Sequence, residues 1–202
     1  MDCKEHPDKG VYVPGLTTCI VKSIQNIRGY VGERTLKRKS RQIKRNKRIH
    51  NFSSAQSVGI IFQCRNEEDF QLIKDFKKYL KENKIQATVL GFINDKQIPD
   101  YYLLRTGFNF FCYKNLSWSY KPESQFLQDF INKSFDILFD FSMEYLFPIH
   151  YIVSLTNADY KIGRLTKEED YDLMIDITKK KETGFFIEQV KVYLNMIRHS
   201  SN

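Results

Sequence analysis

The chain has 202 residues, 42% of them apolar, with 16 phenylalanines and 12 tyrosines, which suffices for one domain with a sizeable core plus an appendage. Its formal net charge of +8 is confined to residues 22–50, which carry eleven Lys or Arg against a single Glu. No apolar stretch approaches the ~20 residues that span a bilayer, and four scattered cysteines argue against a disulfide framework or a zinc site. The N-terminus also lacks the pattern of a signal peptide, so we expect a cytoplasmic protein.

The N-terminal quarter of the chain divides into two predicted parts. Residues 1–19 are polar and punctuated by proline and glycine, which indicates a disordered or extended N-terminus. Residues 20–50 are predicted to form a basic helical segment, because Ile20, Ile24, Ile27 and Val31 recur at helical spacing. Two glycines within it, at positions 29 and 32, leave a kink or two shorter helices as an alternative. A linker is expected at residues 51–54.

Residues 55–199 are predicted to form an α/β domain. Apolar runs of strand length lie at residues 58–63, 87–93, 108–112, 136–141, 160–163 and 173–177. Helical patterns lie at about residues 66–83, 122–133, 148–157 and 184–197, the first with Asn66 as its N-cap. Strands that alternate with helices predict a mostly parallel, six-stranded, Rossmann-like three-layer sandwich with strand order 3-2-1-4-5-6, preceded by the basic N-terminal helix.

The densest run of charge is the most informative motif. Eight bases lie within twelve residues: Lys37, Arg38, Lys39, Arg41, Lys44, Arg45, Lys47 and Arg48. Such density costs mutual repulsion unless a polyanion neutralises it, although a solvated linker helix is the structural alternative. Residues 33–50 lack the broad apolar face of a membrane-surface helix, whereas residues 20–31 keep that alternative open. The pattern fits structured RNA, where phosphates and shape dominate recognition.

The expected crevice of the sheet offers a second candidate site. Asp140 and Ser142 follow the fourth strand and Arg164 follows the fifth, so these three residues are candidates for a nucleotide or sugar ligand. Asp140 and Ser142 also suit an ordinary strand end and turn. The chain has no glycine-rich phosphate loop and no catalytic triad, so we assign no catalytic residue, metal or cofactor. The aromatic loop at residues 118–120 is a candidate for base stacking or for a core or lid position.

The chain resembles an uncharacterised family of Bacteroidota proteins. The residues that carry this resemblance are the basic stretch 37–48 and the segments 57–62 (SVGIIF), 135–140 (FDILFD), 161–164 (KIGR) and 171–176 (YDLMID). The resemblance covers about residues 25–197 and implies a small Rossmann-like body behind a basic helix, with no functional residue to transfer. The region of the fourth and fifth strands also resembles one lobe of a two-lobed glycosyltransferase.

These patterns together lead to one expectation and two alternatives. We expect a non-enzymatic RNA- or ribosome-associated protein whose basic helix binds phosphates and whose body contacts a protein partner. One alternative is an enzyme or sensor that binds a nucleotide or nucleotide sugar in the crevice. The other is peripheral attachment to an anionic membrane surface.

Overall fold

A computed structural model of the chain describes residues 14–167 and 170–197, and in the first helix it describes side chains from Ile27 onward. Six parallel strands form one sheet in the order β3-β2-β1-β4-β5-β6. The strands are β1 (Ser57–Gln63), β2 (Gln86–Phe92), β3 (Asn109–Phe111), β4 (Phe135–Asp140), β5 (Ala158–Arg164) and β6 (Leu173–Ile175). The predicted α/β fold and strand order are therefore confirmed.

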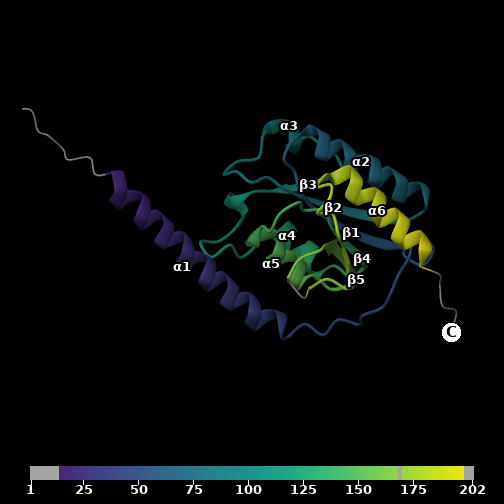
Figure 1. Cartoon of the computed structure of the whole chain (residues 1–202), viewed down its shortest axis with the longest axis horizontal. Helices are drawn as coiled ribbons and strands as arrows, with labels where there is room; N and C mark the ends of the chain where they lie inside the picture. Colours follow the sequence, from purple (N-terminus) through teal and green to yellow (C-terminus); the bar gives the residue numbers. More distant parts are fainter. Residues whose placement is uncertain (1–13, 168–169, 198–202) are drawn as a thin grey trace, which may run out of the picture.

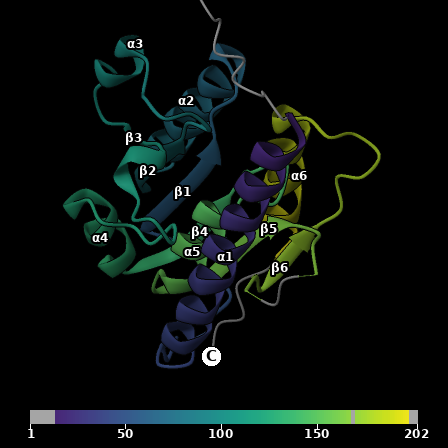
Figure 2. The same ribbon diagram turned by 90° about the vertical axis from the view of Figure 1, so that its left-hand side faces the viewer.

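Helices cover both faces of the sheet. They are α1 (Pro14–Ser40), α2 (Glu67–Glu82), α3 (Asp100–Leu103), α4 (Gln125–Asn132), α5 (Phe147–Leu155) and α6 (Thr183–Met196), with a short 3₁₀ turn η1 (Tyr113–Asn115). Helices α2 and α6 pack on one face, and α4 and α5 on the other (Figure 1). Helix α1 lies outside α5 and crosses it as an additional layer (Figure 2). Within the described residues, none of the helices combines the length and apolarity needed to cross a lipid bilayer.

The local sequence explains these elements. Strand β1 is buried on both faces from Val58 to Gln63, as the continuous apolar run predicts for a central parallel strand. Helix α2 begins where predicted, because the Asn66 side chain accepts a hydrogen bond from the Asp69 N–H at 2.9 Å. Helix α5 carries Pro148 in its first turn, where a missing N–H costs no hydrogen bond. The weakly patterned α3 and η1 were not predicted.

The N-terminal segment differs from its prediction. Helix α1 continues through both glycines without interruption but ends at Ser40, so the expectation of a helix up to residue 50 is wrong. Residues 41–56, here called the strap, run along one side of the body from the end of α1 to β1 (Figure 1). Of the predicted disordered or extended N-terminus, residues 1–13 lie outside the described residues, whereas residues 14–19 belong to α1.

The predicted linker at residues 51–54 is instead packed against the body. Asn51 and Phe52 are buried, and the Asn51 side-chain amide donates to the Ile197 carbonyl at 2.8 Å. The Phe52 ring packs edge-on against the rings of Phe76 and Tyr79 in α2. The end of the strap therefore joins the core on the α2–α6 face, which fixes the path of the chain into β1.

Candidate nucleic-acid interface

One face of α1 rests on the body through three residues spaced four apart, here called the helix seat. The Arg28 guanidinium donates to the Trp118 carbonyl at 2.7 Å, and its carbon lies 4.7 Å from the centre of the Tyr120 ring. One turn later, Gly32 approaches so closely that a Cβ atom would lie 2.6 Å from the Ser119 carbonyl oxygen. Leu36 completes the helix seat and is 5% exposed in the core beside α5. The aromatic loop 118–120 thus serves as the surface on which α1 rests.

The apolar positions that predicted the helix, where the structure describes their side chains, do not face the body. Ile27 is 54% exposed and Val31 is 38% exposed, whereas the docked residues are Arg28, Gly32 and Leu36. Helical periodicity alone points to Ile27 and Val31 as buried positions, because it ranks positions by hydrophobicity. A glycine and an arginine that packs through its stem and guanidinium plane give no such signal.

Five of the eight predicted phosphate contacts gather where α1 ends, and we call them the basic end: Lys37, Arg38, Lys39, Arg41 and Lys44. Four of these side chains are exposed, and none of the five has an ion-pair partner within residues 14–167 and 170–197. Burial, followed by the charges of Lys121 and Arg38, lowers the pKa of the half-buried Lys39. Among the described residues the basic end is therefore a cluster of cations without ion-pair partners, with Glu33 as an acidic neighbour, and the dipole at the α1 C-terminus favours some of these cations locally.

Two of the predicted phosphate contacts are engaged by the body instead. Arg45 forms a two-pronged ion pair with Asp172, at 2.8 Å and 2.9 Å, and also donates to the Ala158 carbonyl at 3.0 Å. Lys47 Nζ lies 3.1 Å from the same carboxylate. Arg48, the eighth predicted contact, has an exposed side chain, and its backbone N–H donates to the Asp159 carbonyl at 3.2 Å. The strap is extended because these contacts hold it alongside β5 and the start of β6.

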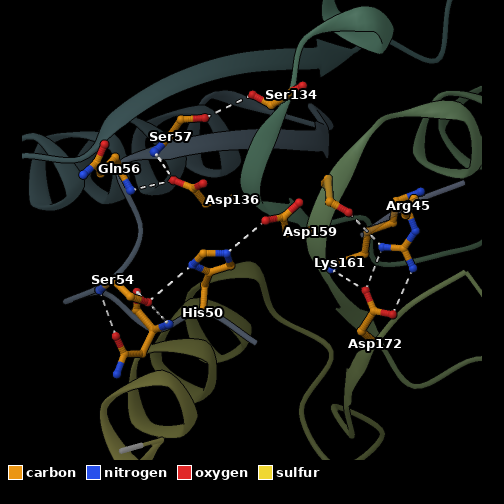
Figure 3. Close-up of polar contacts among 12 residues, drawn as sticks. Arg45, His50, Ser54, Gln56, Ser57, Ser134, Asp136, Asp159, Lys161 and Asp172 are labelled. Carbon is orange, nitrogen blue, oxygen red and sulfur yellow. Dashed lines mark hydrogen bonds and ion pairs between the residues drawn. The ribbon is translucent and has the colours of Figure 1, made fainter. Parts of the chain in front are cut away.

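A second group of contacts holds the strap near residue 50 (Figure 3). The buried His50 ring lies 3.2 Å from the Asp159 carboxylate, measured from Nε2 to Oδ2. Asp136 accepts hydrogen bonds from the backbone N–H groups of Gln56 and Ser57, at 2.7 Å and 2.9 Å. His50, Asp136 and Asp159 bring three potential metal-ligand atoms within 4.8 Å of one another, a separation that a divalent cation could bridge. Their hydrogen bonds already account for the cluster as an anchor of the strap.

Lys161 lies beneath the Arg45–Asp172 pair. Its side chain is 1% exposed and donates to the Val153 and Ser154 carbonyls at the end of α5. Burial, followed by the charge of Arg45, lowers the pKa of Lys161 to about 7, while Asp170 and Asp172 act in the opposite direction. The Asp172 carboxylate also accepts the Lys161 backbone N–H at 2.9 Å, so strap, strand and helix meet at one polar cluster.

A groove of about 630 Å³ separates α1 from the body next to the basic end. Lys37 and Arg41 line the α1 side together with Glu33, and the other side has Lys167, His150 and Asp170. The sequence prediction missed Lys121 and Lys167 because each is an isolated base in a loop. Only the folded structure brings them beside a basic segment that lies far away in the chain.

The second predicted site is assembled in part. Asp140, at the end of β4, accepts hydrogen bonds from the Ser142 N–H at 2.9 Å and from the Tyr171 hydroxyl at 2.5 Å. Arg164 lines the same cavity, but its volume is only about 20 Å³, which suits roughly one water molecule. The Tyr171 ring fills the space over Gly163, where a Cβ atom would collide with it. The three predicted residues are neighbours, and Tyr171 occupies the room that a nucleotide would need.

Residues 28–197 match the model of a family of unknown function, DUF6913. The chain belongs to this family. No curated protein and no solved structure matches it. The DUF6913 match begins at Arg28, the first residue of the helix seat, and it includes the basic end, the strap and the whole sheet. The docked half of α1 is therefore part of the DUF6913 domain.

Proposed function

We propose that this DUF6913 protein binds structured RNA, such as that of a ribosomal particle, by phosphate contacts of its basic end. The proposal rests on exposed cations that lack ion-pair partners among the described residues and that lie in and just after the last turn of a docked helix. Because the helix seat fixes the end of α1 on the body, fewer conformations of the basic end have to be lost when RNA binds. Arg38 and Arg41 add planar guanidinium groups that can bind phosphate oxygens in pairs.

The surroundings of the basic end extend this phosphate-binding surface. Lys121 adds positive charge beside Lys39, whereas across the groove next to α5 Lys167 is accompanied by Asp170. Tyr30, which is 64% exposed on α1, offers a ring on which an unpaired base can stack. A bound RNA would thus contact the basic end of α1, while Arg45 and Lys47 stay with Asp172 and hold the strap.

A membrane surface fits the basic end less well. An interfacial helix needs a broad apolar face opposite its bases. Ile27, Tyr30 and Val31 are the exposed apolar residues on the described part of α1, and they lie before the basic end rather than opposite it. Shape and phosphate recognition therefore account for this arrangement better than insertion into lipid.

The test measures binding of a fluorescently labelled structured RNA by anisotropy over a series of KCl concentrations. For about five phosphate contacts the logarithm of the association constant should fall with the logarithm of salt with a slope of about −4. The double variant Arg38→Glu/Arg41→Glu should weaken binding at least about tenfold and reduce the slope by about 2. Anionic vesicles serve as the competing ligand.

A matched control reverses two exposed charges elsewhere, at Lys179 and Lys181 in the loop before α6. Lys179→Glu/Lys181→Glu changes the net charge equally and should leave the affinity nearly unchanged. Equal losses in both double variants would mean that net charge alone governs binding. If anionic vesicles capture the protein and no RNA binds at low salt, the ligand of the basic end is an anionic lipid surface and the RNA proposal is wrong. In cell lysate, the wild-type protein should sediment with ribosomal particles at low salt and leave them at high salt.

A further inference from the structure

A second basic surface lies on the opposite side of the sheet, far from the basic end in the chain. It is a groove of about 530 Å³ between α2 and the start of β2, here called the lysine groove. Its walls and floor are Lys74, Lys77, Lys78, Lys81, Lys84, Ile85, Gln86, Ala87 and Phe108. The groove thus combines a wall of lysine ammonium groups with an apolar floor. A helix face that contacts only water would have the lysines without such a floor.

The floor of the lysine groove includes an open stretch of sheet edge. The Gln86 N–H donates to the Gln56 carbonyl, so even-numbered residues of β2 point their backbone groups toward β1. The Ile93 N–H donates to the Phe111 carbonyl, so odd-numbered residues point toward β3. Strand β3 begins opposite Leu90, which leaves Ala87 with no strand beside it. The backbone N–H and C=O groups of Ala87 therefore point toward the lysine groove, and no strand of the sheet forms hydrogen bonds with them.

The lysines are available in different degrees. Lys77 donates to the Gly107 carbonyl and lies 4.5 Å from the centre of the Phe108 ring, and burial together with Lys81 lowers its pKa. Lys78 has one weak partner, Glu82, at 3.9 Å, with both side chains largely exposed. Lys74, Lys81 and Lys84 have no ion-pair partner among the described residues. Lys77 is thus already engaged by Gly107 and Phe108, and the other four lysines can receive anionic groups.

We propose that the lysine groove binds a short acidic peptide segment in extended conformation, which adds to the sheet beside Ala87. The backbone of the segment would pair with the open edge of β2, and its carboxylates would meet the lysines of α2. The aliphatic stems of these same acidic side chains would rest on Ile85 and Phe108, which lie on the same face of the sheet as α2. The segment must be short, because β3 occupies the same edge from Asn109 onward.

The chemistry of the lysine groove favours an acidic peptide over RNA. All its cations are lysines, which act as point charges, whereas paired recognition of phosphates favours arginine, as at the basic end. An unpaired strand edge offers backbone hydrogen bonds that an extended peptide matches and a phosphate backbone does not. The apolar floor likewise suits side chains better than phosphates.

The experiment uses the full-length protein and a blocked peptide that alternates glutamate with threonine, with a glutamine-for-glutamate peptide as the uncharged probe. Isothermal titration calorimetry should show that the acidic peptide binds and that the uncharged glutamine peptide does not. Lys74→Glu/Lys81→Glu should weaken it about tenfold or more, because two attractive charges become repulsive. Ala87→Pro should also weaken it, since proline removes the outward N–H without removing a bond to β1.

Three further outcomes distinguish this proposal from RNA binding at the basic end. Arg38→Glu/Arg41→Glu should bind the acidic peptide like the wild-type protein, because its changes lie at the basic end. The absence of acidic-peptide binding to the wild-type protein would overturn the proposal. So would a loss of RNA affinity in Lys74→Glu/Lys81→Glu as large as that in Arg38→Glu/Arg41→Glu, which would make the lysine groove part of the RNA surface. Circular dichroism checks that Ala87→Pro remains folded.

Discussion

Arg45 in the strap and Asp172 before β6 are joined by two parallel hydrogen bonds of 2.8 Å and 2.9 Å, although 127 positions separate them in the chain. Their side chains are 10% and 11% exposed, so the pair is largely removed from water. Burial opposes ionisation of Asp172, yet hydrogen bonds from Arg45, Lys161 and Lys47 bring its net pKa below the ordinary value. This pair is one of the contacts that hold the segment, which resembles a helix in sequence, as an extended strap.

Removal of Arg45 should therefore destabilise the fold. Arg45→Ala leaves Asp172 partly buried with only Lys47 and a backbone N–H, and we expect a loss of about 2–3 kcal/mol in the free energy of unfolding. Arg45→Lys should lose less, because it keeps the charge but not the two-pronged geometry. Urea denaturation followed by circular dichroism measures both. The neighbouring exposed Lys44→Ala is the control, and a loss of equal size there would refute this account.

The helix seat offers a matched pair of glycines. Gly32→Ala places a Cβ atom 2.6 Å from the Ser119 carbonyl and 2.7 Å from the Phe147 ring, so α1 should separate from the body. Gly29→Ala has nothing within 4 Å and should instead strengthen α1 by about 0.5–1 kcal/mol. The single tryptophan, Trp118, accepts a hydrogen bond from Arg28 and reports the docking by its fluorescence. Identical spectra for both variants would show that the close approach is unimportant.

The lowered pKa of the buried Lys161 side chain should make the stability of the fold depend on pH. Its pKa is about 7 in the folded protein and 10.5 for an ordinary lysine, so the unfolded chain binds more protons between these values. The free energy of unfolding should therefore rise with pH from about 7 upward, by at most about 1.4 kcal/mol per pH unit. Lys161→Met should remove that part of the slope. Urea titrations of both proteins at several pH values provide the comparison, and parallel curves would count against it.

Tyr171 should matter most when Asp140 is ionised. Burial raises the pKa of Asp140, while hydrogen bonds from Ser142 and Tyr171 act against that rise. Tyr171→Phe removes one donor from the carboxylate and should cost about 1–2 kcal/mol at neutral pH. The loss should shrink as the pH falls, because a protonated Asp140 needs that donor less. The exposed Tyr193→Phe is the control, and a loss that does not change with pH would exclude this mechanism.

The parts of the fold that could be predicted depend on near neighbours in the chain. Strand β1 follows from a continuous apolar run, and the start of α2 follows from Asn66 with three acidic residues behind it. Alternating strands and helices predict a parallel sheet, and two successive β-α-β halves suggest the order that the structure confirms. Each of these signals lies within one element or between adjacent ones.

The parts that could not be predicted depend on partners far away in the chain. The path of the strap is determined by Asp159 and Asp172, more than 100 positions after Arg45 and His50. Gly32 reads as a weak point in a helix, whereas the structure uses it for the closest contact with the body. At the carboxyl ends of β4 and β5, a single aromatic ring, Tyr171, fills the crevice, and no local pattern reveals the orientation of that ring.

The residues of the helix seat contact residues far away in the chain, and this separation should affect the order of folding events. Arg28 and Trp118 are 90 positions apart, and the partner of Arg45 lies still later, so α1 can dock only after these later residues have been made, and we expect it to dock late. A nascent chain would expose its basic end before the sheet that orients it is complete. Docking should therefore come after the rate-limiting step of folding. Gly32→Ala would then accelerate unfolding with little change in the refolding rate, which stopped-flow measurements can resolve.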